Sequence, residues 1–156
     1  MMMAEIIRDH AKLFSIIESL KKKGKKIIFA NGCFDVLHVG HIRCLNDAKD
    51  LGDILIVAVN DDKSMRIIKG DGHPLMPEDE RMEILAALRS VDYITLFSEK
   101  TVDSLLLKLK PHVHAKGTDY TVETVPERET VLSYGGEIAI TGDQKNHSSS
   151  EIKNAL

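Results

Sequence analysis

The chain has 156 residues, of which 43% are hydrophobic and 29% charged, and its formal net charge is −3. This length suits one domain with a single core, and the weakly acidic balance argues against general nucleic-acid binding, which needs a basic surface. The sequence has no apolar run near the roughly 20 residues that span a bilayer and no signal-peptide pattern. It has only two cysteines, Cys33 and Cys44. We therefore expect a cytoplasmic protein with free thiols.

The first predicted elements are a helix and a strand. Apolar residues at helical spacing, among them Leu13 and Ile17, predict a helix over Glu5–Lys21. The lysines that follow and Gly24 suit the end of a helix better than a nucleic-acid site. We therefore divide the chain into an N-terminal helix with a basic turn, residues 1–25, and a main domain, residues 26–156.

Strands and helices alternate through the rest of the chain. The predicted strands are Ile27–Ala30, Ile54–Val59, Tyr93–Phe97, His112–Ala115 and Glu137–Ile140. The predicted helices are Gly40–Leu51, Asp61–Ile68, one with Pro77 at its first position, one capped by Thr101 and ending at Leu109, Pro126–Tyr134, and one that opens at Ser148. This order predicts an α/β fold with a single doubly wound, mainly parallel, five-stranded sheet. Ligands bind such sheets beyond the carboxyl ends of the strands, at the switch in strand order.

The loop after the first strand carries the strongest chemical signal. Gly32 lets the backbone turn so that amides of Cys33 and Phe34 face an anion. His38 and His41 are three residues apart at a predicted helix start, and Gly40 between them admits a ligand. Imidazoles, amides and a helix N-terminus together predict a phosphate site. A zinc site formed by Cys33 and the two histidines is the weaker alternative, because no fourth ligand is evident.

These residues resemble a known family. Gly32-Cys33-Phe34-Asp35 followed by His38-Val39-Gly40-His41 is similar to the HxGH motif of the cytidylyltransferase-like nucleotidyltransferase superfamily, whose fold is Rossmann-like. Further blocks, covering about Lys26 to the C-terminus, resemble the branch that adenylylates D-glycero-β-D-manno-heptose 1-phosphate in ADP-heptose synthesis. These blocks include Asn31-Gly32-Cys33-Phe34-Asp35, Ile68-Lys69-Gly70, Lys116-Gly117-Thr118-Asp119-Tyr120 and Gly135-Gly136-Glu137.

The resemblance implies a role for each matching residue. His38, His41 and Lys69 would be catalytic, with Lys69 in a mobile loop rather than a plain surface lysine. Gly32, Cys33, Phe34, Asp35, Gly40, Lys116, Gly117, Asp119 and Ser148, Ser149 and Ser150 would bind the nucleotide. Asn31, Arg81 and Tyr120 are weaker candidates for substrate contact, and Arg81 has the alternative of pairing with Glu78 or Glu83.

Some residues have competing explanations or depart from the family pattern. The block around Asp119 would also suit a plain turn, and Ser148 with Glu151 would also suit a capping box. Asn146 and His147 precede the serines where the superfamily has glycine, and Asp143 replaces the arginine of cytidylyltransferases, which favours ATP over CTP. The heptose branch has apolar residues at the positions of His112 and His114. Packing in the core or at the surface explains these histidines better than a metal site does.

The sequence therefore predicts an enzyme that transfers AMP from ATP, with Mg²⁺, to a sugar 1-phosphate in a heptose or lipopolysaccharide pathway. We expect no nucleic-acid or membrane partner, a homodimer, and a separate sugar kinase that supplies the substrate. The rivals are a cytidylyltransferase for an alcohol phosphate such as glycerol 3-phosphate, and a nucleotide-binding sensor without catalysis.

Overall fold

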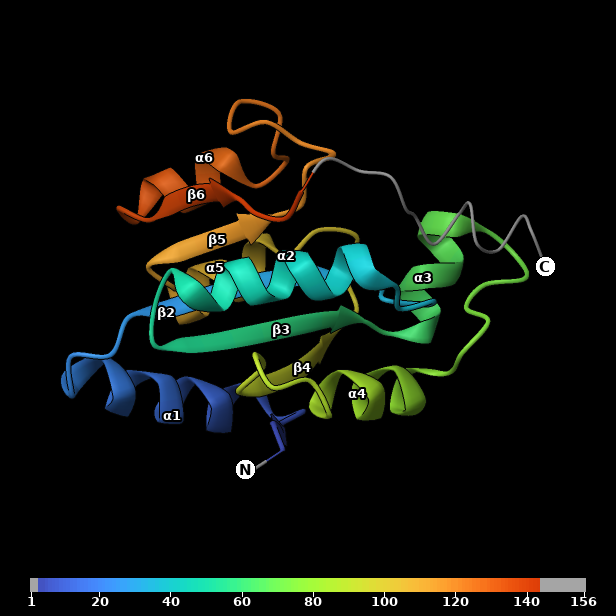
Figure 1. Ribbon diagram of the computed structural model, residues 1–156, viewed down its shortest axis with the longest axis horizontal. Helices are drawn as coiled ribbons and strands as arrows, with labels where there is room; N and C mark the ends of the chain where they lie inside the picture. Colours follow the sequence, from blue (N-terminus) through green and yellow to red (C-terminus); the bar gives the residue numbers. More distant parts are fainter. Residues whose placement is uncertain (1–2, 144–156) are drawn as a thin grey trace.

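Six parallel strands form one sheet with helices on both faces (Figure 1), in a computed structural model that describes residues 3–143. The strands are β1 (Glu5–Ile6), β2 (Ile27–Gly32), β3 (Ile54–Asn60), β4 (Tyr93–Phe97), β5 (Val113–Lys116) and β6 (Glu137–Ile140). The helices are α1 (His10–Lys22), α2 (Val39–Asp50), α3 (Asp62–Lys69), α4 (Glu78–Ala86), α5 (Asp103–Leu109) and α6 (Arg128–Ser133). The α/β prediction is confirmed, and the sheet has one strand more than we predicted.

The additional strand comes from the start of the predicted N-terminal helix. Glu5 and Ile6 pair with Tyr93 and Ile94 of β4, so the prediction of helix from Glu5 is wrong for its first residues. The helix begins instead at His10, because the Asp9 carboxylate accepts hydrogen bonds from backbone amides of the first turn.

The other boundaries differ from prediction by a residue or two. Pro77 precedes α4 as its N-cap instead of occupying its first position. Thr101 does not cap α5: its hydroxyl donates to the Asp103 carboxylate, and the helix starts at Asp103. Similar shifts affect β5, which starts one residue late, and α6, which is shorter than Pro126–Tyr134 at both ends. The helix predicted to open at Ser148 lies outside the described residues.

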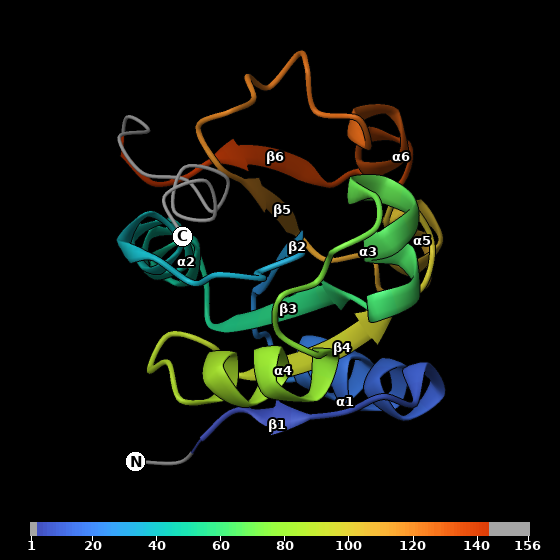
Figure 2. The same cartoon turned by 90° about the vertical axis from the view of Figure 1, so that its right-hand side faces the viewer.

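Helices cover both faces of the sheet (Figure 2), and each face has its own apolar core. On one face α2 and α4 pack against alternate strand residues, including Ile28, Val57 and Ala115. On the other face α1, α5 and α6 pack against the residues between them, including Phe29 and Ile56. Because side chains alternate along a strand, neighbouring residues at each strand end point to opposite faces.

The strand order is β1-β4-β3-β2-β5-β6. The chain passes from β2 to β3 on one side and returns to add β5 on the other side. The carboxyl ends of β2 and β5 therefore mark the switch point where a ligand is expected. None of the helices within residues 3–143 combines the length and the apolar composition needed to cross a membrane.

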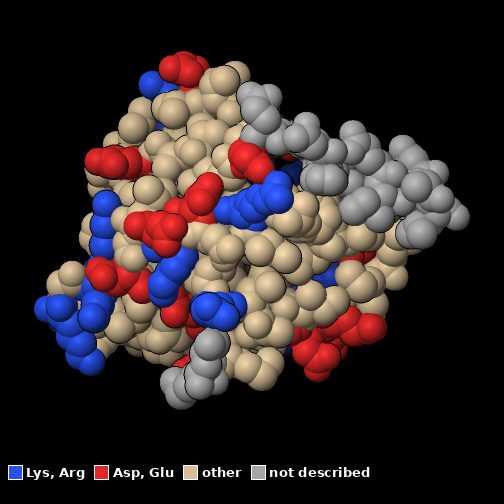
Figure 3. Space-filling view, in the orientation of Figure 1, with Lys and Arg blue, Asp and Glu red and all other residues tan. Residues whose placement is uncertain are grey.

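Lysines and arginines do not form a broad patch on the face that carries α2. Figure 3 shows them gathered at the lower left, where Figure 1 places the turn between α1 and β2, and intermixed with acidic residues elsewhere. Gly24 in this turn has φ 81°, the left-handed conformation expected of a glycine that follows a helix.

His114 is a buried polar residue in the middle of β5. Its side chain is fully enclosed, its ring packs edge-on against Phe29 at 5.7 Å between centroids, and its Nε2 lies 2.8 Å from the side-chain amide oxygen of Asn31. Burial, with a smaller contribution from Lys116, lowers its pKa to about 3. His112 lies outside this core, and its Nδ1 accepts a hydrogen bond from the Ile27 amide. The two histidines therefore do not form a joint metal site, and His114 is part of the core.

We expect His114 to make the protein acid-sensitive. The folded state holds the ring neutral, whereas the unfolded chain protonates it near pH 6.5. Its contribution to stability is complete above pH 6.5 and is lost as pH falls toward about 3, by about 1.4 kcal/mol per pH unit. Urea unfolding of the wild type and of His114→Gln across this range should show a shallower pH dependence in the variant. Parallel curves would contradict the prediction.

Candidate nucleotide site at the carboxyl edge of the sheet

Two histidines form the start of α2. His38 is the N-cap, and its Nδ1 accepts a hydrogen bond of 3.1 Å from the Gly40 amide. The Nδ1 of His41 accepts from the His38 amide at 3.2 Å, which completes a capping box made of imidazoles. A ring whose Nδ1 accepts carries its proton on Nε2 when it is neutral. Both rings are therefore held as Nε2–H donors, the form suited to phosphate oxygens.

The two imidazoles lie together, with ring centroids 4.0 Å apart. Phe34 packs against His41 at 5.4 Å, and the backbone of Phe34 has φ 49°, a left-handed conformation that is uncommon for a bulky side chain. Backbone strain of this kind costs of order 1–3 kcal/mol and is found mainly at functional sites. The predicted loop of residues 32–35 is thus a fixed wall beside the two rings.

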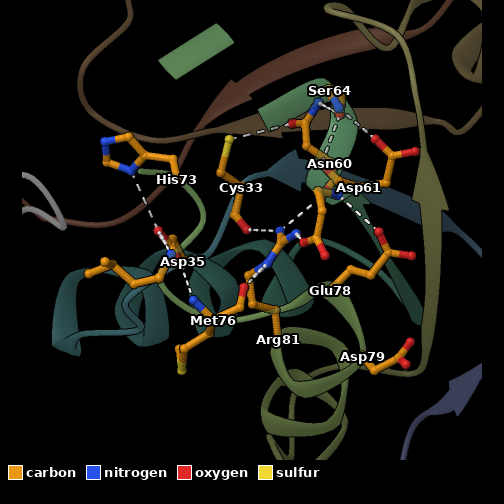
Figure 4. Close-up of polar contacts among 12 residues, drawn as sticks. Cys33, Asp35, Asn60, Asp61, Ser64, His73, Met76, Glu78, Asp79 and Arg81 are labelled. Atoms are coloured by element: carbon orange, nitrogen blue, oxygen red, sulfur yellow. Dashed lines mark hydrogen bonds and ion pairs between the residues drawn. The ribbon is translucent and has the colours of Figure 1, made fainter. Parts of the chain in front are cut away.

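Arg81 holds this wall from behind (Figure 4). The side chain is 1% exposed, and its guanidinium donates to the carbonyl oxygens of Cys33 at 2.6 Å and Asn60 at 2.7 Å. It also donates to the Met76 carbonyl and to the Asp62 carboxylate. Its charge partner is Asp62, so the expected pairing with Glu78 or Glu83 is wrong. Arg81 connects the ends of β2 and β3 with the start of α4.

Asp35 fixes the same loop from its other end. Its carboxylate, 1% exposed, accepts hydrogen bonds of 2.9 Å from the amides of Leu75 and Met76. The segment before α4 is thereby attached to the loop after β2. Asp35 lines the cavity described next, and its hydrogen bonds assign it a structural role.

A cavity of about 440 Å³ opens at the carboxyl ends of β2 and β5, the switch point of the sheet. It brings together most of the predicted site residues. Those that line it are Asn31, Gly32, Cys33, Phe34, Asp35, His38, Gly40, His41, Lys69, Lys116, Gly117, Asp119 and Tyr120. Arg81 is not among them, and Ser148, Ser149, Ser150 and His147 lie outside the described residues.

Lys69 is the last residue of α3, not part of a loop as predicted, and it is exposed where it lines the cavity. Gly70 after it has φ 90°, which ends the helix. An ammonium group on a four-carbon stem at a helix end can reach phosphate oxygens without a change in the fold.

The β5 end of the cavity contains a cation, an aromatic ring and a buried acid. The Lys116 ammonium lies 4.8 Å from the centre of the Tyr120 ring and 3.9 Å from Oε1 of Glu127. Asp119 is exposed beside them. Opposite, Gly117 and Gly142 lie against Cys44: a Cβ on Gly117 would be 4.0 Å from the Cys44 sulfur, and one on Gly142 would be 3.3 Å from its Cα. Both glycines line the cavity on the side of α2, where they pack against Cys44.

Cys44 is a free thiol whose pKa is raised, chiefly because it is buried. Its Sγ lies 3.0 Å from the Thr141 hydroxyl, so it is a packing group and not a thiolate ligand. The Sγ of the other cysteine, Cys33, donates to the side-chain amide oxygen of Asn60. Within residues 3–143, no three side chains of the His, Cys, Asp and Glu types are grouped to hold a metal.

The sequence did not identify several residues that line the cavity. They are Asn60, Lys100, Thr101, Glu127 and Thr141. They come from the ends of separate strands or from loops without a recognisable motif, so their spacing along the chain gives no signal. Asn60 and Thr141 were detectable in principle, because each directly follows a predicted strand at the carboxyl edge.

Comparison with known proteins agrees with this geometry. The family model described as cytidylyltransferase-like matches residues 29–155. The bifunctional protein HldE of Pelobacter propionicus is 46% identical over 146 residues, which is 94% of this chain and 30% of that protein. HldE of Geobacter metallireducens is 48% identical over 86% of this chain and 27% of its own length. The chain thus spans less than a third of these relatives.

Solved structures support the same fold. A lipopolysaccharide core biosynthesis protein from Thermoplasma volcanium superposes with a TM-score of 0.67 at 28% identity, covering 78% of this chain and all of that one. Pantoate-beta-alanine ligase from Francisella tularensis superposes with a TM-score of 0.68 at 22% identity, over 97% of this chain and 76% of its own, and shows the fold alone.

The position of Arg81 leads to a stability prediction. Arg81→Met removes a buried charge that satisfies three carbonyls and Asp62. We expect a loss of about 3–5 kcal/mol in the free energy of unfolding, because buried partners lose their donors. The matched control is Arg8→Met, which removes an exposed ion pair with Glu78 and Asp79 and should cost less than about 1 kcal/mol. Urea titration measures both, and equal losses would contradict the assignment.

Proposed function

We propose, on the premise that this chain belongs to the cytidylyltransferase-like family and is a nucleotidyltransferase, that it transfers AMP from ATP to D-glycero-β-D-manno-heptose 1-phosphate. The products are ADP-heptose and pyrophosphate. The observation that carries the proposal is the pair of imidazoles held as Nε2–H donors at the edge of a switch-point cavity. The choice of heptose rests on the sequence blocks described above, and the similarity to proteins named HldE supports it.

The proposed reaction needs no covalent nucleophile. A sugar 1-phosphate already carries an anionic oxygen, which attacks the α-phosphorus while the bond to the pyrophosphate oxygen breaks on the opposite side. Catalysis then consists of positioning and of stabilising the charge that develops on phosphoryl oxygens. His38 and His41 donate to these oxygens, and Lys69 at the end of α3 neutralises the departing pyrophosphate.

The two sides of the cavity suit different parts of the substrates. The α2 side of the cavity is lined by Gly117 and Gly142, which place no side chain there. We assign the nucleoside to this side, where Asp119 accepts from the ribose. The other side has Asn31 and Lys116, on the face of the sheet that packs against α5 and α6, and Glu127 just before α6. This side remains for the acceptor.

Mg²⁺ bound with ATP would neutralise charge on the phosphate oxygens. The described side chains fit an ion bound chiefly through the nucleotide, because the histidines and Lys69 at the phosphate end are nitrogen donors and Mg²⁺ prefers oxygen ligands. Asp143 also lines the cavity and is exposed, so its carboxylate would be available to the ion.

A place in a reaction sequence follows from the substrate. We propose that a sugar kinase acts before this enzyme, because phosphorylation of a sugar supplies a sugar 1-phosphate. ADP-heptose then serves lipopolysaccharide synthesis. The expected homodimer and the cytoplasmic location rest on the sequence alone and stay predictions.

A nucleotide and acceptor screen tests the proposal. Release of pyrophosphate should occur with ATP and heptose 1-phosphate, and CTP should support less than about one hundredth of that rate, a difference of about 2.7 kcal/mol. The panel includes glycerol 3-phosphate with CTP as the rival pair. Turnover of that pair in the absence of the first would overturn the proposal, and binding of ATP without any turnover would favour a sensor.

Variants of His41 test the role of the imidazoles. His41→Ala should lower kcat by about 100- to 1,000-fold, the effect of removing one preorganised donor to a developing charge. His41→Gln should lose less, because its amide nitrogen can occupy the place of Nε2. Steady-state kinetics separates the two variants, and thermal melting shows whether loss of the capping box alone unfolds them. Equal kinetic losses in two folded variants would argue against a donor role.

A further inference from the structure

The Glu127 carboxylate is buried beside the cavity, and its Oε1 has no hydrogen-bond donor among the described residues. Glu127 is 3% exposed, lies just before α6 and lines the cavity. No donor within residues 3–143 reaches its Oε1. The Lys116 ammonium at 3.9 Å balances its charge but is too distant for a hydrogen bond. A buried oxygen of this kind is costly unless something else satisfies it.

The negative charge of Glu127 excludes a phosphate as the missing hydrogen-bond partner. Phosphate oxygens accept hydrogen bonds and carry negative charge, so a carboxylate repels them. Groups that donate, such as hydroxyls, satisfy a carboxylate directly. Lys116 beside it donates to hydroxyl oxygens, so the pair offers both an acceptor and a donor to a polyhydroxylated ring.

The geometry of the proposed reaction places the sugar ring of the acceptor beside Glu127. The acceptor phosphate has to meet the α-phosphorus near His38 and His41, and the proposed place of the nucleoside is the α2 side, beside Gly117 and Gly142. The body of the acceptor then extends along the remaining side of the cavity. Lys116 and Glu127 lie on this side, together with Lys100 and Thr101.

We propose that Glu127, held beside Lys116, accepts hydrogen bonds from hydroxyl groups of the acceptor sugar and so selects a polyhydroxylated acceptor over a smaller alcohol phosphate. The inference rests on the proposed function and adds a specificity-determining residue to it. Glu127 takes no part in the transfer of the nucleotidyl group. Its loss should affect the acceptor and leave the nucleotide unaffected.

Kinetics of Glu127→Gln tests the inference. The amide keeps the shape of the side chain but loses the charge that strengthens a hydroxyl–carboxylate bond. We expect the KM for heptose 1-phosphate to rise about 10- to 100-fold and the KM for ATP to change less than about twofold. The matched control is Glu129→Gln, the same change on the exposed side of α6, which should behave as the wild type.

Deoxy analogues of the acceptor supply the second arm, which does not depend on the variant folding. In the wild type, removal of one particular hydroxyl should raise the acceptor KM by a similar factor, and in Glu127→Gln the same removal should have little further effect. A wild type that tolerates loss of every hydroxyl equally would overturn the inference. So would a folded variant whose KM changes for ATP, or for neither substrate.

Failure of the inference and failure of the proposed function give different results. Normal use of heptose 1-phosphate by Glu127→Gln overturns the role of Glu127 and leaves the proposed function intact. Turnover only with glycerol 3-phosphate overturns the proposed function, and it also overturns this inference, because a small alcohol phosphate has no sugar ring for Glu127 to select.

Discussion

One buried cation, the Arg81 guanidinium, determines the shape of the whole phosphate end of the cavity. It donates to backbone carbonyls after β2, at the end of β3 and before α4, three segments that are distant in sequence. Without these donors, the carbonyl groups would be buried and unsatisfied. Asp35 attaches the segment before α4 to the loop after β2. Here the charged group is the acceptor: the Asp35 carboxylate accepts hydrogen bonds from backbone amides. The wall against which the histidines lie is therefore fixed by two charges that need not touch a ligand.

The histidines themselves are preorganised in a similar way. Each Nδ1 completes the helix start, so the ring orientation and the location of its proton are set before any substrate arrives. The Gly40 amide is used by His38, and the anion would therefore be held by the imidazoles and less by amides of the first turn. Preorganised donors of this kind cost no rearrangement during the reaction. The same residues provide helix capping and the proposed chemistry.

The sequence predicted the architecture and the phosphate loop but not the details that depend on distant contacts. Buried runs such as Ile54–Val59 and the glycines and histidines after β2 are local signals, and the structure confirms the α/β sheet and brings these residues to one cavity. The strand at Glu5 was missed because it depends on pairing with Tyr93. The local pattern suggested that Arg81 pairs with Glu78 or Glu83, whereas its partner Asp62 lies on α3. Glu127 gave no signal, because its burial depends on how the loop before α6 folds against Lys116.

The alternation of side chains along β5 has a consequence for insertions and deletions. Ala115 faces α2, whereas His114 and Lys116 face α5 and α6. If one residue were added between Lys110 and Val113 and β5 slipped against β2, the imidazole of His114 would exchange sides with a methyl group and the Lys116 ammonium would leave Glu127. A change in the length of this connection is therefore expected to disrupt the site. Length variants should instead be tolerated in the exposed segment 121–124, which lies outside the sheet.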